Sequence, residues 1–251
     1  MISKNQLKYV RQLELKKYRR QEGVFVAEGP KVVGDLLAAG FCPRNLFATQ
    51  EWIMNSGDGI GNKSVLTPVT DDELRKLSFL QHPQQVIAVM VTPPPAPTDE
   101  VVHGLVLALD GVQDPGNLGT IIRIADWFGI ETIFCSEDTA DAWSPKVVQA
   151  PMGSIARVHV IYTSLADLLD RTQLPVYGTL LDGDDIYNQE LTEEGIIVMG
   201  NEGNGISANI RQRINRRLLI PDFHPGGTAD SLNVAIATAI TCSEFKRRTT
   251  K

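Results

Sequence analysis

Hydrophobic positions in the first ninety residues alternate between helical and strand spacing. Leu7, Val10, Leu13 and Tyr18 recur at intervals of three to five residues, which predicts a basic amphipathic helix. Short apolar runs predict strands, and Pro30 suits the first turn of a helix. The further predicted elements are strands at 24–27, 45–48 and 86–91 and helices at 31–39 and 71–77. This alternation indicates a small α/β layer domain.

The rest of the chain alternates more regularly. Strands are predicted at 105–109, 132–135, 176–180, 196–199 and 218–220, and helices at 118–128, 165–169 and 232–245. Several of these strands are continuously apolar, which is typical of a parallel sheet buried on both faces. Ligands bind such sheets beyond the carboxyl ends of the strands, so function is expected in the loops there.

A proline-rich segment separates the two patterns. Four of the five residues from Pro93 to Pro97 are prolines, which cannot join a helix or a central strand because each lacks a backbone donor. We therefore predict two domains, residues 1–97 and 98–251.

The two predicted domains differ in net charge, and this changes what the charge of the chain indicates about its partners. The net charge of the whole chain is −6, which argues against a nucleic-acid partner. Residues 1–97, however, carry 12 basic and 9 acidic side chains, whereas residues 98–251 carry 12 and 21. Seven basic residues lie within the first 20, and further basic clusters lie at 211–217 and 246–251. Local patches matter more to a polyanion than net charge does, although a solvated helix face explains any single cluster equally well.

Cysteine and histidine usage argues against a disulfide scaffold and a metal site. The three cysteines lie far apart without a CxxC pair, and the four histidines are scattered. The N-terminus has no apolar core after its charges, and no apolar run approaches the roughly 18 residues of a membrane span. We expect a cytoplasmic protein that binds no metal and no membrane.

Three loops at predicted strand ends carry unusual polar residues. In the first, Asn117 is a plausible N-cap of the following helix, and Arg123 lies six residues further on, among isoleucines. An arginine in such surroundings usually binds an anionic partner. The alternative is a surface arginine whose aliphatic part covers apolar neighbours.

The second loop, residues 199–207, is rich in glycine and contains Glu202. Its GxxGxG order is not the dinucleotide fingerprint, and a glutamate suits a ligand with positive charge or hydroxyl donors; a structural turn is the alternative. The third loop follows Ile220. There Ser231 or Asp230 is expected to cap a helix that looks buried. Ser231 and Asn233 are polar residues at the start of that helix, and buried polar groups need hydrogen-bond partners, which a bound ligand could supply.

In this order and spacing, the three loops resemble the SpoU/TrmH branch of the SPOUT superfamily of RNA 2′-O-ribose methyltransferases. The matching motifs are Asn117 to Arg123, Gly200-Asn201-Glu202-Gly203, and Ile220-Pro221 with Ser231-Leu232-Asn233-Val234. Residues 1–95 look like the RNA-binding domain, similar to ribosomal proteins, that commonly precedes it. The resemblance implies an α/β fold whose C-terminal parallel-sheet domain contains a trefoil knot. It also implies S-adenosylmethionine as cofactor, RNA as substrate, and a homodimer whose active site is completed near the subunit interface.

The resemblance further implies roles for particular residues. Arg123 would stabilise a developing alkoxide, and Asn117 would hold Arg123 or the ribose in place. Glu202, Ser231 and Asn233 would complete the polar site. The cofactor would lie against the backbone of a second set of residues, Thr179, Leu180, Gly200, Ile220 and Leu232.

Two segments depart from the family pattern. Residues 222–230 replace a shorter loop that contains methionine, and Gln149 and Pro151 stand where arginine and serine are frequent. Ribosomal RNA is the favoured substrate because the N-terminal domain resembles that of ribosomal RNA modifiers. The alternatives are a transfer RNA methyltransferase, a non-catalytic RNA-binding relative and a nicotinamide-dependent oxidoreductase.

Overall fold

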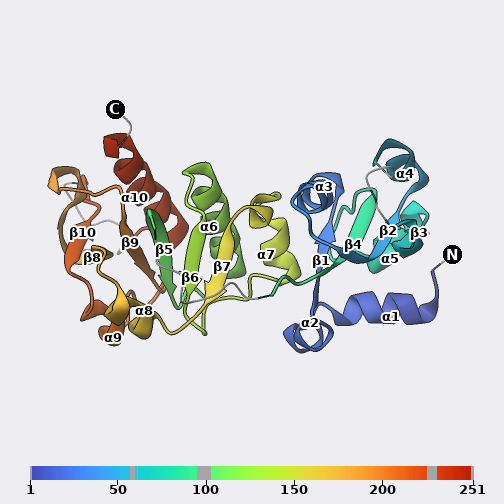
Figure 1. The fold of residues 1–251 in the computed structure, drawn as a ribbon, viewed down its shortest axis with the longest axis horizontal. Helices are drawn as coiled ribbons and strands as arrows, with labels where there is room; N and C mark the ends of the chain where they lie inside the picture. Colours follow the sequence, from blue (N-terminus) through green and yellow to red (C-terminus); the bar gives the residue numbers. More distant parts are fainter. Residues whose placement is uncertain (1, 57–59, 61, 95–102, 225–230, 250–251) are drawn as a thin grey trace. The chain divides into compact units, whose positions relative to one another are not determined.

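The computed structural model describes residues 2–56, 60, 62–94, 103–224 and 231–249 (Figure 1). Its internal contacts divide the chain into two units. Unit 1 comprises residues 1–94 and 141–157, and unit 2 comprises residues 95–140 and 158–251. The proline segment beyond Pro94 lies outside the described residues, so the boundary at residue 97 stays a prediction.

Unit 1 is built on a four-stranded sheet of order β1-β4-β2-β3, in which β4 runs antiparallel to β1 and β2. One core cluster joins apolar side chains of α1 and α5 to those of the strands, and α3 and α7 contact β1. The elements of unit 1 are α1 (Lys4–Gln12), α2 (Lys16–Glu22), β1 (Val24–Glu28), α3 (Pro30–Ala38), β2 (Pro43–Ala48), α4 (Gln50–Ser56), η2 (Lys63–Val65), β3 (Leu66–Pro68), α5 (Asp71–Leu77), β4 (Val86–Val91), α7 (Pro145–Gln149) and η3 (Ser154–Ala156).

The predicted first helix is two helices. Val10 and Leu13 are fully buried, and an unbroken helix would next turn Lys17 toward the same face. Instead the backbone at Leu15 is extended, and α2 restarts so that Arg19 points inward while Lys17 stays exposed. Gly23, with φ of 62°, then ends α2 in the left-handed conformation that glycine adopts without strain.

Unit 2 confirms the predicted parallel sheet. Six strands pair in the order β10-β8-β9-β5-β6-β7, and every ladder is parallel. The elements of unit 2 are β5 (Leu105–Asp110), α6 (Pro115–Trp127), β6 (Thr132–Cys135), β7 (His159–Tyr162), α8 (Leu165–Arg171), β8 (Val176–Asp185), η4 (Ile186–Asn188), β9 (Gly195–Gly200), α9 (Ala208–Arg211), β10 (Arg216–Leu219) and α10 (Val234–Thr249).

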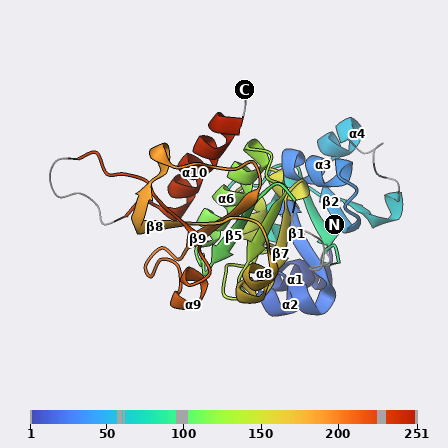
Figure 2. The same cartoon turned by 60° about the vertical axis from the view of Figure 1, so that its left-hand side comes forward.

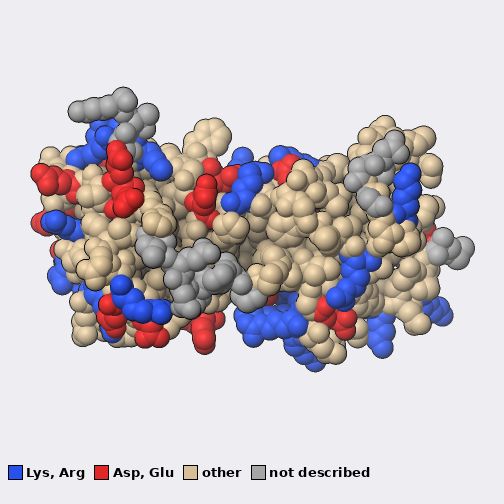
Figure 3. Space-filling model, viewed as in Figure 1, with Lys and Arg blue, Asp and Glu red and all other residues tan. Residues whose placement is uncertain are grey.

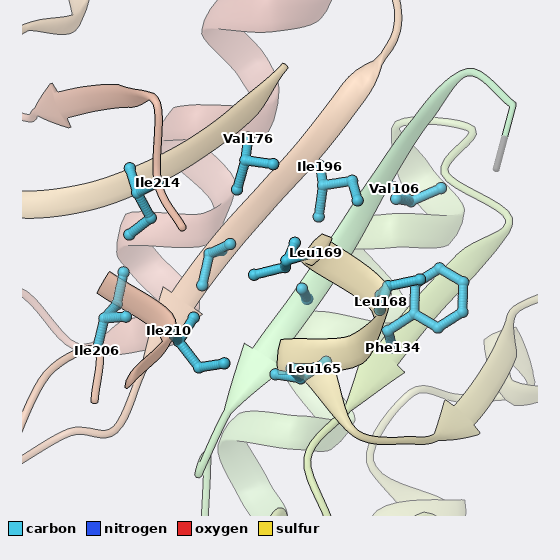
Figure 4. Close-up of a cluster of buried hydrophobic side chains, with 12 residues drawn as sticks. Val106, Phe134, Leu165, Leu168, Leu169, Val176, Ile196, Ile206, Ile210 and Ile214 are labelled. Atoms are coloured by element: carbon cyan, nitrogen blue, oxygen red, sulfur yellow. The ribbon is translucent and has the colours of Figure 1, made fainter. Parts of the chain in front are cut away.

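Helices cover both faces of this sheet. On one face, Leu165, Leu168 and Leu169 of α8 and the isoleucines in and around α9 pack on the strands (Figure 4). On the other, α6 and α10 lie side by side (Figure 2). The predicted trefoil knot depends on the path through residues 225–230, which lie outside the described residues, so the knot stays a prediction.

Candidate active site

A cavity of about 610 Å³ lies beside β8 and beyond the ends of β9 and β10. Its wall is formed by residues 179–182 of β8, residues 199–206 at and after the end of β9, Leu219 and Ile220 at the end of β10, and the residues around the start of α10. Seven of the ten predicted site residues line it: Thr179, Leu180, Gly200, Glu202, Ile220, Ser231 and Leu232. These four segments therefore meet at the edge of the sheet where parallel strands bind ligands.

The turn after β9 brings bare backbone to the cavity wall. A Cβ atom at Gly200 would lie 2.3 Å from the backbone carbon of Gly205, so no other residue fits there. Asn201 and Gly205 exchange two backbone hydrogen bonds of 2.9 Å. The Asn201 side chain accepts hydrogen bonds from the amides of Gly203 and Asn204 and donates to the carbonyl of Gly111 at 2.7 Å. Asn201 thus fixes the turn and joins it to the loop after β5, a role that the motif did not reveal.

Three predicted polar residues form a hydrogen-bonded chain beside the cavity. Asn117 Nδ2 donates to Glu202 Oε1 at 2.8 Å, and Asn233 Nδ2 donates to Asn117 Oδ1 at 3.0 Å. Glu202 and Asn233 are exposed, and Asn117 is half-buried. Because these residues come from the first turn of α6, the turn after β9 and the segment before α10, the hydrogen bonds orient Glu202 and bring the two amides together.

The predicted helix caps are wrong in both places. Asp114, not Asn117, caps α6: its carboxylate accepts from the amide of Asn117 at 2.8 Å, and Pro115 occupies the first turn. Asn233, not Ser231, caps α10, because its Oδ1 accepts from the amides of Ala235 and Ile236. Asp230 lies outside the described residues.

The expectation of buried polar groups at the start of α10 is also wrong. Ser231 and Asn233 are both exposed, because they precede the first buried residue of the helix, Val234. Asn233 finds its partners within the protein, in the helix backbone and in Asn117.

Arg123 stands apart from the cavity. It is exposed on α6, while Ile121, Ile122 and Ala125 are buried against the rest of unit 2. It is not among the described residues that line the cavity. The sequence placed it in the site through the first motif, and the structure places it two turns along α6 from Asn117.

An ion pair at the cavity wall was not predicted. Arg211 of α9 pairs with Asp182 of β8, and Arg217 approaches the same carboxylate at 3.6 Å. The hydrogen bond from Arg211 holds the pKa of Asp182 below its usual value. The sequence marked this arginine only as part of a basic cluster, because its acidic partner lies 29 positions away.

Within the described part of the chain, no group of three or more histidine, cysteine, aspartate or glutamate side chains could hold a metal ion. Among the described helices, none is long and apolar enough to cross a membrane.

Comparison with known families matches nearly the whole chain. Residues 104–243 match the SpoU rRNA Methylase family, and residues 4–88 match the MRM3-like substrate binding domain. The chain is 32% identical over 244 residues to the 23S rRNA (guanosine(2553)-2′-O)-methyltransferase RlmP of Bacillus subtilis strain 168, covering 95% of each protein.

Solved structures agree over the same length. A protein of the TrmH family from Porphyromonas gingivalis is 42% identical, with a TM-score of 0.88 and 99% of each chain covered. An rRNA methyltransferase from Sinorhizobium meliloti, solved with bound AdoMet, is 29% identical with a TM-score of 0.89, and the match covers 100% of this chain and 97% of that one.

Proposed function

The chain belongs to the SpoU rRNA methylase family, and we propose that it transfers a methyl group from S-adenosylmethionine to a ribose 2′-hydroxyl of structured RNA. Ribosomal RNA is the favoured substrate, since the similar proteins are named for it. The observation that carries the proposal is the cavity, where four segments of the chain supply all five residues expected to hold the cofactor.

The residues of the cavity fit S-adenosylmethionine. A volume of about 610 Å³ is in the range of small-molecule sites, and Leu180, Ile220 and Leu232 provide apolar walls. The turn after β9 that forms part of the wall requires glycine at position 200, because a Cβ atom there would meet the backbone of Gly205. The carboxylate of Glu202 suits a ligand with sulfonium and ammonium charges, whereas Asp182 is already paired with Arg211. When bound, the cofactor supplies an electrophilic methyl group.

The polar residues beside the cavity position the RNA and stabilise charge. Arginine is essentially always protonated, so Arg123 acts as an electrostatic partner for the negative charge that develops on the ribose oxygen rather than as a base. Asn117, held between Glu202 and Asn233, orients the ribose. Ser231 adds a hydroxyl at the cavity wall.

A homodimer accounts for two exposed apolar side chains on helices that contact each other. Trp127 of α6 is 84% exposed and Ile236 of α10 is 52% exposed. Arg123 and Trp127 are four residues apart and so lie on one face of α6. A partner that covers Trp127 would therefore also cover Arg123, which supports a role for this residue in a site completed near the subunit interface.

The test is transfer of label from S-adenosylmethionine to RNA from cells that lack the gene. We expect ribosomal RNA to be labelled at a ribose, and transfer RNA to remain unlabelled. Arg123→Ala should abolish turnover and leave cofactor binding intact by calorimetry, whereas Arg75→Ala, an exposed arginine of unit 1, should change neither. RNA binding without cofactor binding would contradict the proposal and identify a non-catalytic relative. Sedimentation should give a dimer that Trp127→Glu dissociates.

A further inference from the structure

The three basic clusters of the sequence are not equivalent in the structure. In unit 2, Arg213 makes a bidentate contact with Asp170, with distances of 2.8 and 2.7 Å. Arg247 and Arg248 both pair with Glu244, whose side chain is only 5% exposed. These arginines already have carboxylate partners in the folded chain, which reduces the positive charge that they present to a ligand.

Two residues of the N-terminal cluster are also committed to the fold. Arg11 donates to the carbonyl of Ser78 at 2.5 Å and lies over the ring of Phe79. Arg19 is buried, donates to two backbone carbonyls and pairs with Asp141 at 2.6 Å. Their charges serve the packing of unit 1.

Five basic residues remain, and we call their surface the α1–α2 basic face. Lys4 and Lys8 lie one helical turn apart on α1, and Lys16, Lys17 and Arg20 lie on the outer side of α2. All five are exposed, and none pairs with an acidic side chain within the described residues. Figure 3 shows basic side chains gathered over α2 and along α1. The α1–α2 basic face thus contains every basic residue of the two helices except Arg11 and Arg19.

We propose that the α1–α2 basic face binds the sugar-phosphate backbone of the RNA substrate. This inference rests on the proposed function and adds to it the surface by which unit 1 holds RNA. Exposed lysine and arginine side chains on two successive helices can each contact a phosphate, and such contacts bind without reading sequence. Tyr18, whose ring lies 4.7 Å from Lys17 Nζ, is half-buried against the core of unit 1, so the face consists of charged side chains.

An anionic membrane is the other polyanion that a basic amphipathic helix could meet. Membrane binding needs the apolar face of the helix for insertion among lipids. Here Val10 and Leu13 are fully buried in the core of unit 1, so that face is already used. Apart from Leu15, which is 54% exposed between the two helices, the exposed residues of this region are charged or polar, which favours RNA.

The test compares two triple variants with equal charge change. Lys16→Gln, Lys17→Gln and Arg20→Gln together remove the α2 part of the face, whereas Lys31→Gln, Lys63→Gln and Lys76→Gln remove three lysines elsewhere in unit 1. The full chain is titrated by filter binding with unmodified 23S rRNA across a range of salt concentrations. A plot of log K against log salt has a negative slope, and each lost phosphate contact makes this slope shallower by about 0.7–0.9. The slope of the first variant should therefore be shallower than that of wild type by about two units.

We expect the first variant to bind RNA at least about ten-fold more weakly in 0.15 M salt, and to raise KM for RNA with little change in kcat or in S-adenosylmethionine affinity. The second variant should behave as wild type. Equal RNA binding by the two variants would refute the proposal while leaving the proposed function intact. Failure of the wild-type chain to label any RNA would instead refute the proposed function. Binding to phosphatidylserine vesicles that the first variant loses, with unchanged RNA affinity, would assign the face to membranes and overturn the proposal.

Discussion

The buried ion pair between Arg19 and Asp141 should contribute more to stability than any exposed pair in unit 1. The side chains are 5% and 17% exposed, and the Nη2 to Oδ2 distance is 2.6 Å. Removing one partner of a buried pair costs about 3–5 kcal/mol. In Asp141→Asn the guanidinium keeps its hydrogen bonds to the carbonyls of Leu13 and Glu14, so we expect a loss of about 2–3 kcal/mol.

Thermal and urea unfolding measure this loss. With an unfolding entropy of about 2.1 cal/mol/K per residue, the expected drop in Tm is about 4–6 °C for cooperative unfolding of the 251-residue chain. The matched control is Glu22→Gln, which neutralises the partner of Arg44 in a pair whose side chains are 39% and 40% exposed. It should cost at most about 1 kcal/mol. Equal losses in the two variants would show that burial of the Arg19 pair does not determine its contribution.

Three further outcomes follow from the structure. Gly200→Ala should weaken S-adenosylmethionine binding in calorimetry because its Cβ meets backbone, whereas Gly34→Ala in α3, where a Cβ meets nothing within 4 Å, should not. The hydrogen bond from Arg247 lowers the pKa of Glu244, so the stability that Glu244 contributes is present at neutral pH and is lost as the pH falls below about 4.5. The difference in Tm between wild type and Glu244→Gln should therefore be smaller below that pH than at neutral pH. Ellman's reagent at pH 8 should react with one thiol per native chain, the exposed Cys42, because burial raises the pKa of the other two; two or three fast thiols would contradict the packing.

Elements that bury a continuous apolar run could be predicted from the sequence. The strands at 105–109 and 196–199 lie in the middle of the parallel sheet, where both faces must be apolar. β3 was missed because it has only three residues and ends in Pro68, and β7 was missed because it begins with the exposed His159 and is only half-buried. Such edge strands depend on their neighbours for pairing, which composition alone does not show.

Some features of the candidate site could likewise be predicted from the sequence, and others could not. Residues that directly follow a strand, such as Gly200 and Ile220, could be placed at the cavity because a parallel sheet brings its strand ends together. The contact between Asn201 and Gly111 spans 90 positions. The pairing of Asp182 with Arg211 likewise depends on the register of β8 against β10, so neither contact follows from spacing along the chain.

Unit 1 is discontinuous in sequence, and this has a consequence for its synthesis. Trp143 packs on the ring of Phe25 with centroids 4.6 Å apart, and Asp141 neutralises Arg19. While the ribosome has made only the first 94 residues, Phe25 and Arg19 lack these partners. At about 5–20 residues per second, the missing segment emerges several seconds later. Unit 1 therefore completes its fold only after β5, α6 and β6 of unit 2 have been made, so the two units mature as one nascent chain rather than in succession.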